Sequence, residues 1–401
     1  MFAIAVGILL LSHVGVIKAA EHWTADWRTA LFSTRKPSQH DHVALVLISD
    51  KTLAKLPYRI PIDRGVLAKL IRVVANAEPA AIGIDFAFVR KTDPEKDADL
   101  LAAIKEVNAS GSKVVLGAID ENIPLPKEQL EFHRQFLEKA GVPTGHVYFE
   151  RKTNIYGISD QVVRQMAEEA NEETGQRPFA EVLAAVKRHG ATPRTPYIAW
   201  LLPPWDGSLT FYELEASEIL GQPEDVAKLL TKGLRNKIVL IGADLVDLDR
   251  HLTPMAVADE ARTPGVKVHA QIVAQLVDDD RWLRKFNPLE EFLLLLVVAI
   301  AGFQLSKRFG LGRFPRTIAI VGSALLVGCG IVMFKFGHLL MPYTTALAAW
   351  LASISLGVGI DRLYRNYTAV LRFLYAKGGP PWRRLYRLGT TLGSRYWRGR
   401  L

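Results

Sequence analysis

Carboxylates recur in this sequence directly after short apolar runs, in positions where they could bind a ligand. Asp85 follows the run at residues 80–84, and Asp120 follows residues 113–119. Grouped carboxylate oxygens are the ligands that calcium and magnesium prefer, whereas single Asp and Ser residues at such positions often cap a helix or hold a turn. Both roles stay open for the candidate ligand-binding residues, which are Ser49, Asp50, Asp85, Asp120, Asp244, Asp247, Asp249 and His269.

The sequence lacks the familiar signatures of catalysis. It contains no Gly-x-Ser-x-Gly elbow, no Walker loop, no dinucleotide-binding glycine pattern after the first apolar run and no His-Glu-x-x-His. The one cysteine, Cys329, lies in an apolar segment and excludes an intramolecular disulfide and a cysteine-ligated cluster. We therefore expect neither an enzyme nor a cofactor; the alternative is an external enzyme that acts through the Asp cluster.

An alternation of predicted strands and helices positions these carboxylates. Continuous apolar runs predict buried strands over residues 43–48, 80–84, 113–119 and 237–241. Apolar residues at helical spacing predict helices over residues 63–77, 93–108, 179–188 and 265–276. This order is typical of an α/β domain with a mostly parallel sheet covered on both faces. Since such sheets bind ligands at the carboxyl ends of their strands, we expect the candidate residues to gather at one edge.

Four apolar segments predict membrane-spanning α-helices. They are residues 2–17, 289–306, 317–334 and 339–360. A spanning helix needs roughly 20 apolar residues, and the last three segments qualify. The first is either a cleaved signal peptide or an anchor, and we favour an anchor because no basic residue precedes Lys18. The expected organisation is an anchor at residues 1–20, an external domain at 21–287, three transmembrane helices at 288–360 and a tail at 361–401.

The positive charge of the chain predicts how it is oriented. The net charge is +9, from 50 Lys and Arg against 41 Asp and Glu, and residues 361–401 hold ten basic residues and one acid. Basic residues also fill the connector at residues 307–316, so both segments are expected on the cytoplasmic side and residues 21–287 outside. The residues expected at the membrane surface are Lys307, Arg308, Arg313, Arg316, Arg362, Arg365, Arg372, Arg383 and Arg384.

Basic and aromatic residues alternate in the tail, and this pattern is compatible with several kinds of binding partner. Such a mixture occurs in nucleic-acid-binding proteins and in segments that lie on anionic lipid. We favour the lipid bilayer over nucleic acid, because the tail directly follows a spanning helix. Pairing with another helix is a further alternative, since one helical stripe contains Leu363, Tyr367, Val370 and Leu374.

Several motifs of the external domain resemble the second type of the CHASE group, which are extracytoplasmic bacterial sensor domains. They are VALVLISDKTL at residues 43–53, IPIDR at 60–64, AIGIDFAF at 81–88, NKIVLIGA at 236–243, Thr253-Pro254, and PGVKVHA at 264–270. The layout of one helix before the domain and three after it is similar to that family too. The sequence departs from the pattern at Ser49, where an acid is expected, and at Asp247-Leu-Asp249, where Gly-Asp is expected.

The resemblance implies a sensor of the bacterial inner membrane. Typical members continue into a kinase or cyclase after the last helix, whereas 41 residues follow Ile360 here. We therefore expect an unknown extracytoplasmic ligand and a separate cytoplasmic signalling protein as partners, and a homodimer is compatible with this layout. The alternative is an envelope scaffold or assembly subunit that binds another protein.

Overall fold

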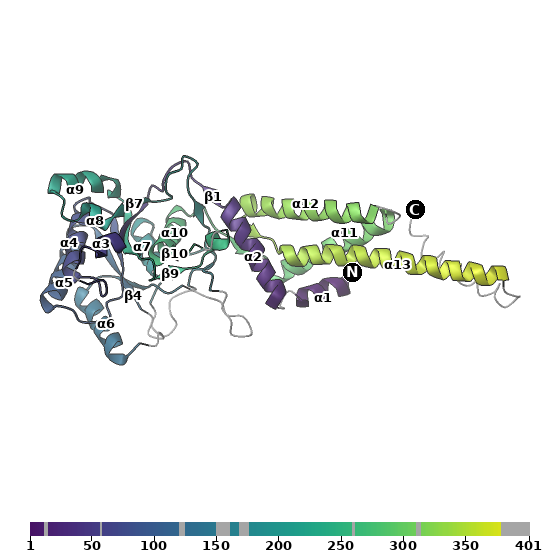
Figure 1. Cartoon of the computed structure of the whole chain (residues 1–401), viewed down its shortest axis with the longest axis horizontal. Helices are drawn as coiled ribbons and strands as arrows, with labels where there is room; N and C mark the ends of the chain where they lie inside the picture. The colour runs from purple at the N-terminus through teal and green to yellow at the C-terminus, as the bar shows by residue number, and fades with distance from the viewer. Residues whose placement is uncertain are drawn as a thin grey trace. The chain divides into compact units, whose positions relative to one another are not determined.

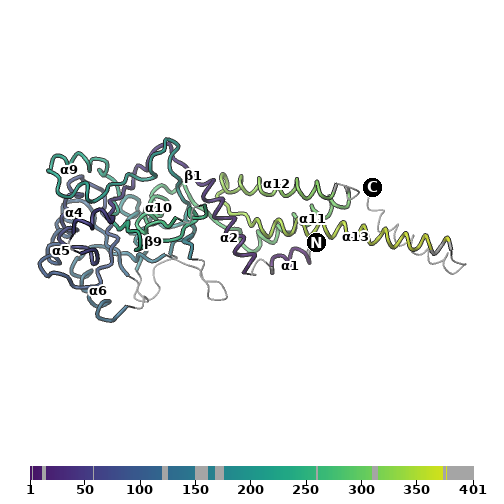
Figure 2. The backbone as a smooth tube through the Cα atoms, viewed as in Figure 1, coloured from purple at the N-terminus to yellow at the C-terminus, as the bar shows by residue number. Residues whose placement is uncertain are grey.

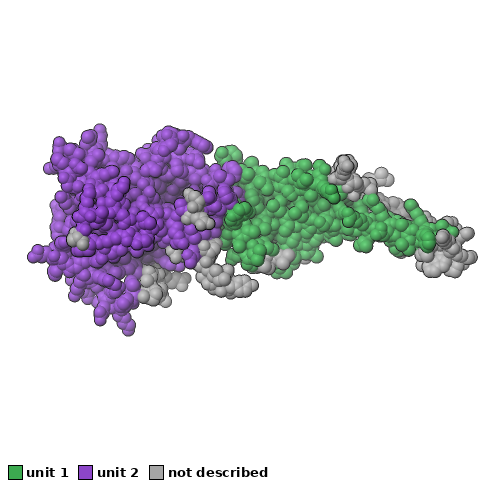
Figure 3. All heavy atoms as spheres, in the orientation of Figure 1, with its two compact units in different colours: residues 1–25, 285–401 green, residues 26–284 purple. Residues whose placement is uncertain are grey.

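The chain folds into two units, which are coloured separately in Figure 3. The computed structural model describes residues 1–11, 15–56, 58–119, 125–149, 161–167, 176–258, 261–309 and 314–377. An α/β unit comprises residues 26–284, and a helical unit comprises residues 1–25 and 285–401.

The α/β unit is built on a six-stranded sheet in which every neighbouring pair of strands is parallel. The strand order is β5-β4-β3-β8-β2-β7. The strands are β2 (Val43–Ser49), β3 (Ala81–Asp85), β4 (Lys113–Ala118), β5 (Thr144–His146), β7 (Tyr212–Glu215) and β8 (Ile238–Asp244). The expected mostly parallel sheet is thus confirmed.

Helices cover both faces of this sheet and close two separate hydrophobic cores (Figure 1). Alternate residues of β2 point to opposite faces, so Val46 joins the first core and Leu45 the second. The first core is covered by α4 (Arg64–Ala75), α5 (Pro94–Ala109), α6 (Lys127–Ala140) and α8 (Ala216–Ile219). The second is covered by α7 (Phe179–Lys187) and α10 (Gly265–Asp278).

Helix starts in this unit follow from local capping. The Asp63 carboxylate accepts the backbone N–H groups of Gly65 and Val66 at the start of α4, and Asp93 accepts that of Glu95 at the start of α5. The remaining short elements are α3 (Asp50–Leu53), α9 (Glu224–Thr231), η1 (Lys232–Leu234), η2 (Pro254–Val257), β1 (Thr34–Arg35), β6 (Leu201–Leu202), β9 (Arg250–His251), β10 (Thr263–Pro264), β11 (Arg284–Lys285) and β12 (Leu339–Leu340).

The helical unit contains α1 (Phe2–Leu11), the start of α2 (Gly15–Phe32), α11 (Pro288–Phe309), α12 (Phe314–Gly337) and α13 (Tyr343–Lys377). Figure 2 shows α11, α12 and α13 running alongside one another. Small residues permit their close approach: Gly322 of α12 lies against the Trp350 ring, and Gly357 of α13 against Ser306. The Trp350 indole also donates to the Ala319 carbonyl, at 3.2 Å.

Three helices are long and apolar enough to cross a membrane, namely Pro288–Arg308, Pro315–Gly337 and Tyr343–Phe373. The expected count of four is not confirmed. The N-terminal segment forms two helices, α1 and α2, whose axes differ by 84° across a break, and they make a fourth span only if this bent pair crosses together.

Candidate functional site

A cavity of about 520 Å³ opens at the carboxyl ends of the parallel strands. We call it the strand-end cavity. Strands β2, β3 and β8 contribute Ile48, Asp85 and Ala243, and α10 contributes His269. The volume lies in the range of pockets that bind small organic molecules. The carboxyl edge of a parallel sheet, where we expected a site, therefore holds a concave space.

The polar residues of the strand-end cavity come from three places in the chain. Asp85 is the last residue of β3, and His269 lies in the second turn of α10. Asp249 lies in the loop after β8, where its φ of 51° is left-handed, and its carbonyl accepts the N–H of Gly265 at 2.9 Å. His251 Nε2 contacts Asp249 Oδ1 at 2.9 Å and fixes the carboxylate. These residues are far apart in the sequence, and they come together only when the sheet has folded.

His269 is a buried, neutral histidine on the wall of this cavity. Only 3% of its surface is exposed, and its ring centroid lies 4.4 Å from that of Phe149 and 5.3 Å from that of Phe179. Burial lowers the pKa of His269 to about 3, although the nearby Asp249 opposes this shift. Its Nδ1 has no hydrogen-bond partner among the described residues. A neutral imidazole has one acceptor nitrogen, and Nδ1 is available for that role.

Asp85 places a second unsatisfied polar atom in the same cavity. The residue as a whole is partly exposed, but its Oδ2 is shielded from solvent and has no hydrogen-bond partner among the described residues. Burial raises the pKa of Asp85 well above its usual value, and the charge of Asp249 raises it further. A carboxyl group in this environment is held in its protonated form over a wider pH range than a surface aspartate.

Three arginines line the other wall, and two of them, Arg59 and Arg64, are paired with carboxylates. Arg64, which is 2% exposed, places its guanidinium 4.3 Å from the Phe88 ring centroid and its Nε 3.4 Å from Asp97 Oδ1. Arg59 donates from Nε to Asp50 Oδ1 at 3.0 Å and from an Nη to Asp247 Oδ2 at 2.8 Å. Arg90 also lines the cavity, and none of the three arginines acts on the ionisation of Asp85, which therefore has no cationic partner among the described residues.

The remaining predicted site residues lie at strand ends but outside the strand-end cavity. Ser49 caps α3 by accepting the N–H of Lys51 at 3.1 Å, and its hydroxyl donates to Glu215 Oε1 at 2.8 Å. Asp50 and Asp247 share Arg59, while Asp244 is paired with Arg250. Asp120 lies outside the described residues. Ser49 thus caps a helix, and Asp50, Asp244 and Asp247 form structural ion pairs, as the alternative to ligand binding predicted. The cavity contains the other three described candidates, Asp85, Asp249 and His269.

No group of three or more His, Cys, Asp or Glu side chains in the described parts of the chain has the arrangement of a metal site. Three of the carboxylates at the strand ends pair with arginines instead: Asp50 and Asp247 with Arg59, and Asp244 with Arg250. The structure gives the divalent-cation hypothesis no ligand set among these residues.

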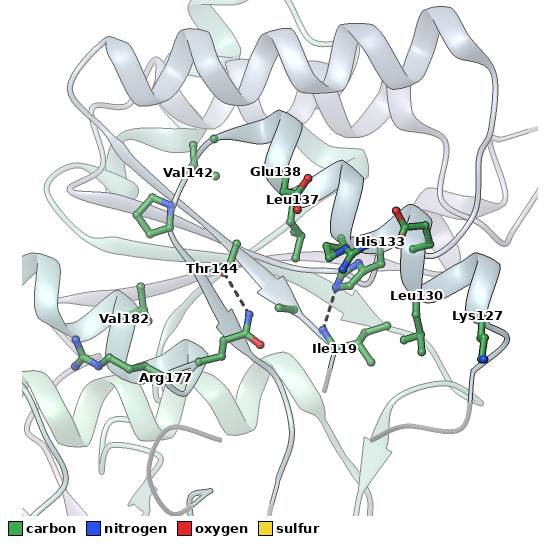
Figure 4. Close-up of a pocket in the computed structure, with 16 residues that line it drawn as sticks. Ile119, Lys127, Leu130, His133, Leu137, Glu138, Val142, Thr144, Arg177 and Val182 are labelled. Carbon is green, nitrogen blue, oxygen red and sulfur yellow. Dashed lines mark hydrogen bonds and ion pairs between the residues drawn. The ribbon is translucent and has the colours of Figure 1, made fainter. Parts of the chain in front are cut away.

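A second depression, of about 970 Å³, lies along α6 at the edge of the sheet (Figure 4). His133 projects from α6 into its wall, where Nε2 accepts the N–H of Ile119 at 3.1 Å and Nδ1 contacts the Phe88 carbonyl at 3.2 Å. Across the depression, the Gln176 amide donates to Thr144 Oγ1 at 3.2 Å. These polar groups have partners within the protein, so we place the candidate site in the strand-end cavity.

Sequence patterns did not identify several residues of the cavity. Arg64 lies in the IPIDR motif, but the motif alone gives no sign that the arginine is buried against Phe88. Phe149, which contacts His269, follows β5 within residues 121–178, where the sequence predicted no strand or helix. That segment supplies α6 and the edge strand β5. Its apolar residues show too little periodicity to predict either β5 or the position of Phe149 in the cavity wall.

The described basic residues of the predicted membrane surface are placed at helix ends and along α13. Lys307 and Arg308 lie in the last turn of α11, and Arg316 in the first turn of α12. Arg362, Arg365 and Arg372 are exposed on α13, which continues through the first part of the predicted tail. Arg313, Arg383 and Arg384 lie outside the described residues.

Comparison with known proteins identifies the family. Neither the curated proteins nor the solved structures include a match to this chain. The CHASE2 domain family matches residues 2–304, which span α1, α2, the α/β unit and most of α11. The chain therefore belongs to the CHASE2 family of extracytoplasmic sensor domains.

Proposed function

We propose that this protein is a sensor of the bacterial inner membrane that binds a small molecule in the strand-end cavity and signals to a separate protein. The observation that carries the proposal is the cavity itself, at the strand edge where parallel sheets bind ligands. Two of its buried polar atoms, Asp85 Oδ2 and His269 Nδ1, are unsatisfied in the described structure. Because unpaired buried polar groups are costly, a ligand that satisfies them would bind favourably.

An envelope scaffold is the alternative, and a concave edge argues against it. A surface that binds another protein through the strand ends needs a broad, accessible face. Here those ends surround a recessed, largely apolar space. We infer further that the protein is not an enzyme, because the described cavity residues include no nucleophile hydrogen-bonded to a base.

The helices offer a route for the signal. Glu21 of α2 accepts the backbone N–H groups of Tyr343 and Thr344, at 3.0 and 2.8 Å, and so caps the start of α13. Further along α2, Asp26 is paired with Arg164 of the α/β unit at 2.8 Å. A ligand that binds two arrangements of α2 unequally would shift α13 as well. We place residues 26–284 outside and the basic end of α13 in the cytoplasm, in line with the distribution of Lys and Arg.

Ligand binding is tested with the full chain in lipid nanodiscs. A panel of small metabolites is screened for an increase in Tm, with Ala87→Trp as a blocked variant, because Ala87 is an exposed residue of the cavity lining. The matched control is Ala102→Trp, at an exposed position of α5. We expect stabilising compounds to act on the wild type and on the control but not on Ala87→Trp. Equal effects on all three proteins would contradict binding in the cavity.

Signalling to a partner is tested separately in the native membrane. Photo-crosslinking residues are placed at Arg365 and Arg372, and the products are compared with those from a variant truncated after Ile360. We expect a specific cytoplasmic adduct, and loss of the response to ligand in the truncated form. An unchanged response without residues 361–401, together with no adduct, would contradict output through a separate protein.

A further inference from the structure

The floor of the strand-end cavity holds two polar atoms without hydrogen-bond partners among the described residues, and the buried Nε of Arg64 is a third such atom in its wall. His269 is a neutral imidazole, so one of its ring nitrogens holds a lone pair, and its unpartnered Nδ1 can accept a hydrogen bond. Asp85 Oδ2 is the second acceptor without a partner among the described residues. A ligand that satisfies both atoms has to bring N–H or O–H groups to the floor.

The charges around the floor favour a cation over an anion. Asp249 lies close enough to Asp85 to act on its ionisation, and no basic side chain contributes to that effect. The titratable and charged groups that surround Asp85 are Asp249, His251, His269, His146, Arg59, Arg64 and Arg90. Of the arginines, Arg59 is directed at Asp50 and Asp247, and Arg64 at Asp97 and the Phe88 ring. Arg90 is exposed, and like the other two it does not act on the ionisation of Asp85. A carboxylate ligand on this floor would be repelled, whereas an ammonium group would replace the missing counter-charge.

The walls are suited to an apolar body attached to that charge. Ile48, Phe86, Leu245 and Leu248 line the cavity, and the Phe149 ring lies beside His269. Aliphatic and aromatic side chains of this kind bury hydrocarbon, and aromatic faces also attract cations.

We propose that the strand-end cavity binds a small organic cation, an amine or amidine with an apolar body, whose N–H groups bond to Asp85 and His269. The inference rests on the proposed function and specifies its ligand class. On binding, the cation takes the place of the proton on Asp85, so one proton leaves the protein for each ligand bound. Affinity consequently increases with pH, by up to tenfold per unit below the pKa of Asp85 in the free protein.

The test compares three probes of one shape and different charge: benzylammonium, benzyl alcohol and benzoate. Binding to the full chain in nanodiscs is measured by calorimetry, with empty nanodiscs subtracted, in buffers of different ionisation enthalpy. We expect benzylammonium to bind most tightly, with release of up to one proton and with affinity that rises between pH 5 and pH 8. Stronger binding of benzoate or benzyl alcohol, or no binding of any probe, would overturn the cation proposal.

The variant Asp85→Asn tests whether benzylammonium binds at the cavity floor rather than elsewhere on the protein. Asn has the shape of a protonated aspartate and is expected to fold, and it removes the ionisable group. We expect at least a tenfold loss of benzylammonium affinity and the loss of its pH dependence, whereas Asp99→Asn, an exposed residue of α5, leaves both unchanged. Unchanged affinity in Asp85→Asn would also overturn the proposal. If benzoate binds instead and Ala87→Trp blocks it, the cavity remains the ligand site and only its charge preference is wrong.

Discussion

At the scale of single residues, the ionised form of Asp85 destabilises the folded protein. Its pKa is raised in the folded protein by burial and by Asp249, so the folded state binds its proton more tightly than the unfolded chain does. The free energy of unfolding therefore decreases as the pH rises from the unfolded value, about 3.9, through the folded one. Each unit of increase in the pKa costs about 1.4 kcal/mol above that range.

The first prediction follows from this cost. Asp85→Asn should be more stable than the wild type at pH 8, by about 1 kcal/mol or more, and the difference should disappear near pH 4. Denaturant unfolding of the full chain in nanodiscs at several pH values measures it. Asp99→Asn, as the control, should follow the pH dependence of the wild type. A wild-type advantage at pH 8 would mean that the Asp85 carboxylate is stabilised in the fold.

A second prediction concerns Asp278, the last residue of α10. Burial alone would raise its pKa, but hydrogen bonds from His40 and Lys36 outweigh burial and hold the pKa below its usual value. The stabilisation is therefore present above the unfolded pKa of about 3.9 and is lost as the pH falls through the folded one. Asp278→Asn should lower the free energy of unfolding at pH 7 by about 3 kcal/mol, since it removes a carboxylate partner of the buried Arg281 and of Lys36.

The exposed neighbour provides the comparison for this substitution. Asp280, whose side chain is 63% exposed, lies 3.7 Å from Arg281. Asp280→Asn should change stability by less than about 1 kcal/mol. Both variants are measured by urea unfolding at pH 7. Similar losses of unfolding free energy would show that the burial of Asp278 does not explain its effect on stability.

The sequence predicted which residues stand at strand ends, but not which of them remain unpaired. Asp50 and Asp247 are both paired with Arg59, and 188 positions separate Arg59 from Asp247. Strand periodicity gives no information on such contacts, because they depend on where loops return after folding. Asp85 and Asp249 were among the candidates, yet their special environment required the cavity geometry.

At the scale of elements, the regular helices and strands were predictable. The predicted helix over residues 265–276 corresponds to α10, and the predicted strand over residues 43–48 to β2. Long apolar periodicity and capping aspartates fix such elements locally. Edge strand β5 is three residues long, so it leaves too short a pattern to recognise. Residues 2–17 were expected as one segment because they contain no Asp, Glu, Lys or Arg residue, whereas the structure has two helices, α1 and α2.

The packing of α12 on α13 leads to the third prediction. A side chain at position 322 would collide with the Trp350 ring, whereas Gly328 of the same helix has no atom within 4 Å of the position of a Cβ. Gly322→Leu should therefore destabilise the helical unit by about 2 kcal/mol, and Gly328→Leu should have little effect. Unfolding by SDS titration, followed by circular dichroism, distinguishes them. Equal stability of both variants would indicate that α12 does not pack through Gly322 in lipid.

At the scale of the whole molecule, the distribution of charge gives the fourth prediction, on topology. In a Cys329→Ala background, single cysteines are placed at Lys228 of α9 and Arg365 of α13, both exposed. An impermeant maleimide should label Lys228→Cys in intact spheroplasts and Arg365→Cys only after permeabilisation. Labelling of Arg365→Cys in intact cells would reverse the proposed orientation.

The unbroken course of α13 has a mechanical consequence. Its 35 residues, at a rise of about 1.5 Å each, make a rod about 52 Å long, while the hydrocarbon layer is only about 30 Å thick. Figure 2 shows α13 continuing past the ends of α11 and α12. With no hinge inside it, a small tilt at Tyr343 would be magnified into a larger sweep at Lys377. A tilt at the Glu21 contact, where α13 begins, would therefore displace Lys377 further than Tyr343.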